Sequence, residues 1–178
     1  HFRLSGSVQE IMDLAGVAHL SAIKSRIPFL HFFDGFRSSA EVQKIESLEM
    51  DDLKKLLDQD ALSRFRENAL NPEHPVTRGT AQNPDIFFQA KEAINPFYEP
   101  IADIVNSYMN EINKLTGREY KPFTYYGAPD AENIIVAMGS ITDTTKEVID
   151  YLTARGEKIG LVSVHLYRPF SSKYFFDI

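Results

Sequence analysis

The chain has 178 residues, of which 43% are hydrophobic and 25% are charged, and its formal net charge is −6 at pH 7. This composition is typical of a globular chain with a packed core, and the acidic balance argues against general binding to nucleic acid or to an anionic membrane. The chain has no cysteine, which excludes a thiolate-ligated iron–sulfur cluster, a disulfide and a thiol nucleophile within these residues. We find no membrane span and no secretory signal in it.

Metal and nucleotide motifs are also missing. The five histidines are scattered without HxxxH or HExxH spacing, and neither GxGxxG nor GxxxxGK[ST] occurs. We therefore expect no metal site built from this chain alone and none of the common glycine-rich nucleotide loops.

The first part of the chain predicts a helix, a strand and a second helix. Ser7 and Glu10 form a capping box, and apolar residues at spacings of three and four predict a helix over residues 7–23. The apolar run of residues 28–33 predicts a strand that is buried on both faces. A capping box at Ser38 predicts that the second helix runs to residue 48.

A charged pair follows the predicted strand directly. Asp34-Gly35 predicts the turn, and Arg37 comes just before the second predicted helix. The ends of buried strands are common places for sites in layered α/β proteins. A purely structural crossover would give the same pattern. Arg37 either pairs with Asp34 or faces an acidic partner or substrate group near the helix N-terminus.

The middle of the chain predicts short helices and two irregular stretches. Residues 71–85 are irregular and contain Arg78 and Thr80, which could hold a phosphate or an acidic neighbour or could simply lie in a surface linker. Residues 118–130 predict a connective stretch at a domain boundary. The predicted helices cover residues 51–58, 61–69, 84–94 and 101–115, and Gly117 ends the last of them.

The C-terminal part predicts a β-α-β unit. Residues 133–138 and 158–166 predict two strands, and residues 143–154 predict the helix between them. A helical crossover implies parallel pairing and a right-handed connection. Gly139-Ser140, before the helix, could bind an anion, although such a turn needs a small residue in any case.

The run PFLHFFDGFRSSAEVQKIE resembles the segment PF-HFFDGFRTSHE-KIE of the long pyruvate:ferredoxin (flavodoxin) oxidoreductases. The resemblance covers nearly all of residues 7–176, and further blocks follow in the family's order. These blocks are residues 71–75, 78–85, 127–132 and 166–170.

The resemblance implies an α/β fold in three parts. Residues 1–48 resemble the C-terminal part of the pyrimidine-binding-like domain of thiamine enzymes. Residues 49–130 resemble its trailing helices and the interdomain linker, and residues 131–178 resemble the opening β-α-β of a transketolase C-terminal-like domain. The chain is then an internal fragment of a larger enzyme.

The resemblance also implies an activity for the whole enzyme, which is the oxidation of pyruvate with coenzyme A to acetyl-CoA and CO2. The electrons pass to ferredoxin or flavodoxin. Thiamine diphosphate, magnesium and iron–sulfur clusters are implied for the whole enzyme, and none of them is expected to bind to this chain alone. A homodimer in the cytoplasm, or in an anaerobic organelle of a eukaryote, is implied as well. We expect the isolated fragment to be inactive and assign it no catalytic residue.

The candidates for a place near the thiamine site or at an interdomain contact are His31, Asp34, Arg37, Ser38, Arg78 and Thr80. Two positions depart from the family pattern, because Ser38 stands in place of its threonine and Ala40 in place of its histidine. The histidine's contact is therefore in doubt. Two other functions stay open, namely a non-catalytic binding or scaffold module and a subunit of a related 2-oxoacid oxidoreductase.

Overall fold

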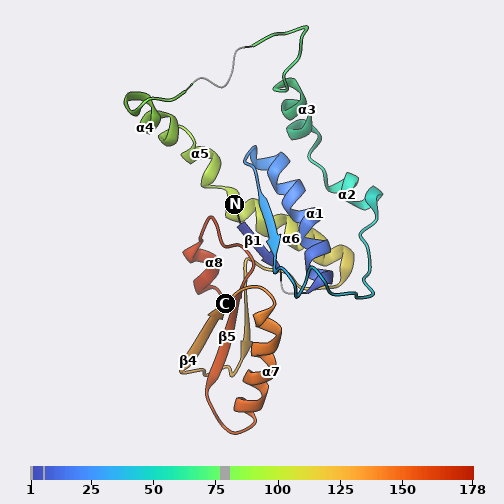
Figure 1. Cartoon of the computed structure of the whole chain (residues 1–178), viewed down its shortest axis with the longest axis vertical. Coiled ribbons are helices and arrows are strands. Elements are labelled where there is room, and N and C mark those ends of the chain that lie inside the picture. Colours follow the sequence, from blue (N-terminus) through green and yellow to red (C-terminus); the bar gives the residue numbers. More distant parts are fainter. Residues whose placement is uncertain (1, 6, 77–80) are drawn as a thin grey trace.

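The structure is a computed structural model that describes residues 2–5, 7–76 and 81–178. Its fold is α/β with two small sheets in an elongated molecule (Figure 1). In the first sheet, β1 (Phe2–Ser5) pairs in parallel with β2 (Leu30–Phe33). The second sheet has the order β3-β5-β4, with β5 antiparallel to β3 and parallel to β4. The strands of the second sheet are β3 (Phe123–Gly127), β4 (Asn133–Ala137) and β5 (Ile159–Val164).

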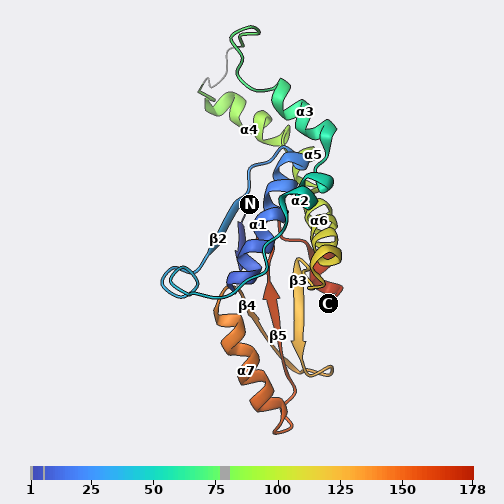
Figure 2. The same ribbon diagram turned by 90° about the vertical axis from the view of Figure 1, so that its right-hand side faces the viewer.

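Two long helices form the main core. Helix α1 (Val8–Ser25) packs against α6 (Ile101–Thr116), and the two lie side by side in Figure 2. The predicted N-cap of α1 is confirmed, because the Ser7 side chain accepts a hydrogen bond from the Glu10 N–H. Gly117 ends α6 with a φ of +70°, as its position predicted. The apolar stripes of both helices meet in one cluster, which includes Leu14, Val17, Ile101, Val105, Met109 and Ile112.

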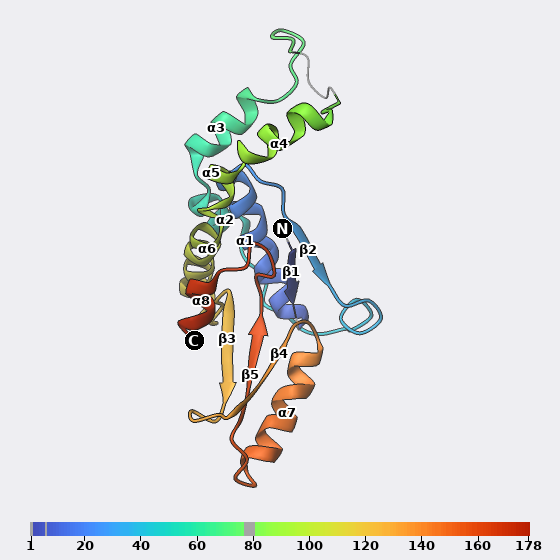
Figure 3. The same ribbon diagram turned by 90° about the vertical axis from the view of Figure 1, so that its left-hand side faces the viewer.

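Short helices extend from this core towards one end of the molecule (Figures 1 and 3). They agree with the short helices predicted from the sequence, apart from the four-residue α5. In chain order they are α2 (Met50–Leu56), α3 (Gln59–Glu67), α4 (Pro84–Glu92) and α5 (Asn95–Tyr98). Of the helices that the described residues form, none is both long and apolar enough to cross a bilayer.

Among the described residues, a helix packs on each of the two faces of the three-stranded sheet. On one face, α7 (Ile141–Thr153) lies against β3 and β5, and the Tyr126 hydroxyl of β3 donates to Asp150 of α7 at 2.6 Å. On the other face, α8 (Ser172–Phe176) places the Phe175 ring 5.3 Å from the ring of Phe123. The β-α-β prediction with parallel strands is thus confirmed.

The predicted helix over residues 38–48 is wrong. Residues 35–40 form turns, and residues 41–49 have no regular structure. Of the apolar residues that the helix would have buried, Leu48 packs against the main core without a helix, whereas Val42 is 98% exposed. Helices in proteins depend mainly on tertiary packing of their apolar face, so the local capping signal was not sufficient here.

A strand was missed within residues 118–130. This stretch was predicted to be connective because Pro122, Gly127 and Pro129 are typical of loops. Strand β3 lies between Pro122 and Pro129 and ends at Gly127, and it pairs antiparallel with β5, with Tyr125 opposite Val162. The connective stretch therefore contributes a strand to the second sheet.

The prediction that the strand of residues 28–33 is buried on both faces is also wrong, and the second apolar strand, β4, is exposed as well. In β2, Leu30 and Phe33 are largely exposed, and so are Ile134 and Val136 in β4. The apolar composition of both strands is that of a sheet with cover on both faces. Among the described residues, that cover is incomplete.

Candidate functional site

The turn after β2 reaches the second half of the molecule. The Asp34 carboxylate accepts a hydrogen bond from the backbone N–H of Ser140 at 2.5 Å, and Ser140 is the residue that precedes α7. Figure 3 shows the loop after β2 beside the start of α7. A carboxylate is favourable at this end of a helix, where N–H groups lack partners and the helix dipole is positive. The sequence suggested that the Gly139-Ser140 turn could bind an anion. In the structure, the Asp34 carboxylate of the same chain takes that position.

Of the other candidates from the sequence, the structure describes His31, Arg37 and Ser38. The His31 ring lies 6.4 Å from the ring of Phe33 on the same strand. Ser38 is buried, and Arg37 is exposed. The alternative in which Arg37 pairs with Asp34 is not observed, because none of the ion pairs among the described residues joins them. Arg78 and Thr80 lie outside the described residues.

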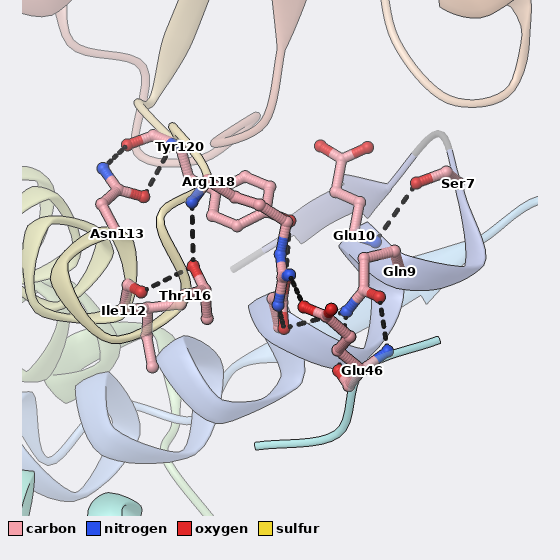
Figure 4. A network of polar contacts seen from close by, with 10 residues as sticks. Ser7, Gln9, Glu10, Glu46, Ile112, Asn113, Thr116, Arg118 and Tyr120 are labelled. Atoms are coloured by element: carbon pink, nitrogen blue, oxygen red, sulfur yellow. Dashed lines mark hydrogen bonds and ion pairs between the residues drawn. The ribbon is translucent and has the colours of Figure 1, made fainter. Parts of the chain in front are cut away.

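A buried charged cluster lies between α1 and the segment after α6, and the sequence did not indicate it. Asp13 of α1 is fully buried and accepts hydrogen bonds from two nitrogens of Arg118, at 2.6 Å from Nε and 3.1 Å from a terminal nitrogen. The Tyr120 hydroxyl donates to the same carboxylate at 2.7 Å. Figure 4 shows Arg118 and Tyr120 extending towards α1. A buried carboxylate is tolerated only with such partners.

The cluster shifts the titration of both partners. The hydrogen bond to Asp13 raises the pKa of Arg118 above its ordinary value, against the opposing effect of burial. Burial, followed by the hydrogen bond to Asp13, raises the pKa of the Tyr120 phenol above its ordinary value of 10.0. Both groups therefore keep their protons across the physiological range.

The same cluster holds the irregular segment of residues 41–49 on α1. Gln9 and Glu46 exchange two hydrogen bonds, since the Gln9 side-chain amide donates to the Glu46 carbonyl at 2.9 Å and its oxygen accepts from the Glu46 N–H at 2.8 Å. Arg118 donates to the Glu46 carboxylate at 2.9 Å (Figure 4). These contacts fix the segment without a helix.

A third polar contact joins α1 to the end of β5. The Nε2 atom of His165 lies 2.6 Å from Oε1 of Glu10, and both side chains are mostly buried. A small polar cavity of about 250 Å³ lies beside them, with Ser7, Thr142 and Lys146 among its lining residues. Asp34–Ser140 and Glu10–His165 thus both connect the N-terminal part of the chain with the β4-α7-β5 unit.

These contacts join the two parts of the molecule. Among residues 2–5, 7–76 and 81–178, no group of three or more His, Cys, Asp or Glu side chains is placed to hold a metal ion. Two of the contacts that sequence reasoning missed, Asp13–Arg118 and Asp34–Ser140, join residues more than 100 positions apart. Only the acidic residue on an otherwise apolar helix face, Asp13, could have indicated one of them.

Two family models match the chain. Residues 2–110 match the thiamine diphosphate-binding domain of pyruvate flavodoxin/ferredoxin oxidoreductase. Residues 131–175 match core domain II of pyruvate:ferredoxin oxidoreductase. The first match begins at residue 2, so the similarity extends further towards the N-terminus than residue 7, where the resemblance from the sequence began.

Similar proteins are much longer than this chain. It is 65% identical over 170 residues to a pyruvate-flavodoxin oxidoreductase of Enterobacter agglomerans, which covers 96% of this chain and 14% of that protein. It is 56% identical over 174 residues to the pyruvate:ferredoxin oxidoreductase of Moorella thermoacetica, and this match covers 98% of this chain and 15% of that protein. The chain therefore spans about a seventh of the length of these curated relatives.

A solved structure has a similar fold. It is a 2-oxoglutarate:ferredoxin oxidoreductase from Magnetococcus marinus with 2-oxoglutarate, coenzyme A and succinyl-CoA bound. The TM-score is 0.55 at 16% sequence identity, and the similarity covers 99% of this chain and 32% of that one. At this identity the comparison supports the α/β fold alone.

Proposed function

The chain belongs to the pyruvate flavodoxin/ferredoxin oxidoreductase family, and on that premise we propose that it is an internal segment of such an enzyme. The whole enzyme oxidises pyruvate with coenzyme A to acetyl-CoA and CO2 and passes the electrons to ferredoxin or flavodoxin. We place it in the cytoplasm, or in an anaerobic organelle of a eukaryote, as a homodimer. The segment alone does not turn over pyruvate.

Within that enzyme, the segment holds two domains in a fixed arrangement. The observation that carries this role is the pair of contacts Asp34–Ser140 and Glu10–His165, each of which joins residues in the 2–110 match to residues in the 131–175 match. The division at residues 48 and 130 is part of the same proposal. The start of the second family match at residue 131 supports the latter boundary.

Thiamine diphosphate is the cofactor named in the first family match. The described residues do not fit a complete site for it. The helix N-terminus at Ser140, which could receive a phosphate, is occupied by the Asp34 carboxylate. No described cluster of acidic or histidine side chains is placed to hold magnesium. We assign the residues that bind the diphosphate, the magnesium and the iron–sulfur clusters to the remainder of the enzyme.

An anaerobic assay with pyruvate, coenzyme A, thiamine diphosphate, magnesium and a viologen dye tests the proposal. We expect dye reduction by the full-length protein, with acetyl-CoA as product, and none by residues 1–178 alone. Replacing pyruvate with 2-oxoglutarate is the control for substrate class. Turnover by the isolated segment, or a full-length protein that is inactive on pyruvate, would contradict the proposal.

A further inference from the structure

A short connector, residues 117–122, joins the end of α6 to the start of β3. It lies between the two family matches, which cover residues 2–110 and 131–175. A connection of this kind either bends as a hinge or holds its two ends in a fixed geometry. Mobile segments have few buried contacts and few protected hydrogen bonds, so the contacts of the connector distinguish the two cases.

Asn113, near the end of α6, binds the connector with both polar atoms of its side chain. Its Nδ2 atom donates to the Tyr120 carbonyl at 2.9 Å, and its Oδ1 atom accepts from the Tyr120 N–H at 2.7 Å (Figure 4). One side chain thereby pairs both backbone groups of Tyr120, as an opposite residue in an antiparallel strand pair would. The side chains of Tyr120 and Arg118 also reach the buried carboxylate of Asp13 on α1. The connector is therefore bound to both long helices.

The other end of the connector is bound to the segment that follows β5. The Pro122 carbonyl accepts hydrogen bonds from the backbone N–H groups of His165 and Leu166, at 2.9 Å and 3.1 Å. Leu166 is fully buried, and it belongs to the apolar cluster between α1 and α6. The core of the helices therefore continues into the three-stranded sheet at this point.

We propose that the connector is a strut that sets the position of the three-stranded sheet relative to α1 and α6, and that Asn113 is the positioning residue that holds it. This inference rests on the proposal that the segment keeps two domains of an oxidoreductase in a fixed arrangement. The contacts Asp34–Ser140 and Glu10–His165 join the same two parts of the molecule, so they depend on the geometry of the connector. A hinge would let them open without any change in the hydrogen bonds of Asn113.

Asn113→Ala tests the strut, because it removes both hydrogen bonds to Tyr120 and introduces a residue that favours helix. Hydrogen–deuterium exchange of the full-length protein is the measurement. We expect at least ~10-fold faster exchange at residues 118–127, and also at residues 140–142, where α7 begins beside the turn after β2. Asn113→Asp should restore part of the protection, since its carboxylate can still accept from the Tyr120 N–H. Asn110→Ala, at an exposed position of the same helix, is the matched control and should change neither region.

Faster exchange at residues 118–122 alone would mean that Asn113 only orders the end of α6, and it would overturn the inference. Unchanged exchange would overturn it as well. An increase that extends to α3, which the connector does not contact, would indicate general unfolding and would also count against the strut. The expected increase in a full-length protein that does not oxidise pyruvate would support the strut and remove only the proposed activity.

Discussion

The Asp34 carboxylate lies 2.5 Å from the backbone nitrogen of Ser140, a residue 106 positions later in the chain. The turn that ends β2 therefore caps the first helix of the second sheet. Asp34 lies in the first family match, over residues 2–110, and its partner Ser140 lies in the second, over residues 131–175.

We predict that Asp34→Ala lowers the free energy of unfolding by about 1 kcal/mol, because α7 loses a hydrogen-bond acceptor and a favourable charge at its N-terminus. Asp34→Asn should retain part of this stabilisation, since its amide oxygen can still accept the hydrogen bond from the Ser140 N–H. Urea unfolding measures the loss, and faster amide exchange at residues 140–142 locates it. Asp85→Asn, at an exposed helix start, is the control. An Asp34→Ala chain with unchanged exchange at these amides would refute the capping role.

Removing Arg118 should be far more damaging. Arg118→Ala leaves the fully buried Asp13 carboxylate without its cation, and breaking a buried pair in this way typically costs about 3–5 kcal/mol. Glu46→Gln, which changes an exposed partner of the same guanidinium, should cost less than about 0.5 kcal/mol. Denaturant unfolding of both variants gives the comparison. If Arg118→Ala lowered the free energy of unfolding as little as Glu46→Gln, the buried cluster would contribute little to stability.

The raised pKa of Tyr120 predicts a dependence on alkaline pH. The unfolded phenol ionises near pH 10.0, whereas the folded phenol, buried and bonded to Asp13, keeps its proton to higher pH. The stabilisation from Tyr120 is therefore complete below pH 10 and declines above it, by about 1.4 kcal/mol for each pH unit. The difference in unfolding free energy between wild type and Tyr120→Phe should shrink between pH 9.5 and 11, a range set by the same ionisation. A difference that is constant with pH would contradict this explanation.

Arg37 should affect activity more than stability. It is exposed and makes no ion pair with Asp34, so it is available to a ligand or to another part of the full-length enzyme. Arg37→Ala in the full-length protein should lower kcat/KM for pyruvate about tenfold, equal to about 1.4 kcal/mol, with thermal unfolding unchanged. Lys44→Ala, at another exposed cation of the same loop, is the control. Parallel losses of activity and stability would indicate a structural role instead.

The sequence predicted the elements that local signals specify. Ser7 begins α1, Gly117 ends α6, and the strands of the β-α-β unit are parallel. It failed where tertiary structure decides. The capping box at Ser38 starts no helix, and Val42 on the expected apolar side is exposed, whereas β3 exists because β5 provides it with a partner. The Asp13–Arg118 pair could not be predicted, because no local pattern links residues 105 positions apart.

The incomplete cover of the sheets argues against the alternative that this chain is a free-standing binding module. Such a module needs a closed core, whereas Ile134, Val136 and Phe176 leave an apolar surface open on one side of the second sheet. Exposed apolar strand edges promote association. The isolated chain should accordingly associate at high concentration, which sedimentation can measure.

The mass of the native polypeptide, captured with an antibody against this chain and measured under denaturing conditions, tests most directly whether these residues belong to a larger enzyme. A polypeptide several times heavier than the 20.2 kDa of these residues is the predicted result. A native polypeptide of 20.2 kDa would contradict it.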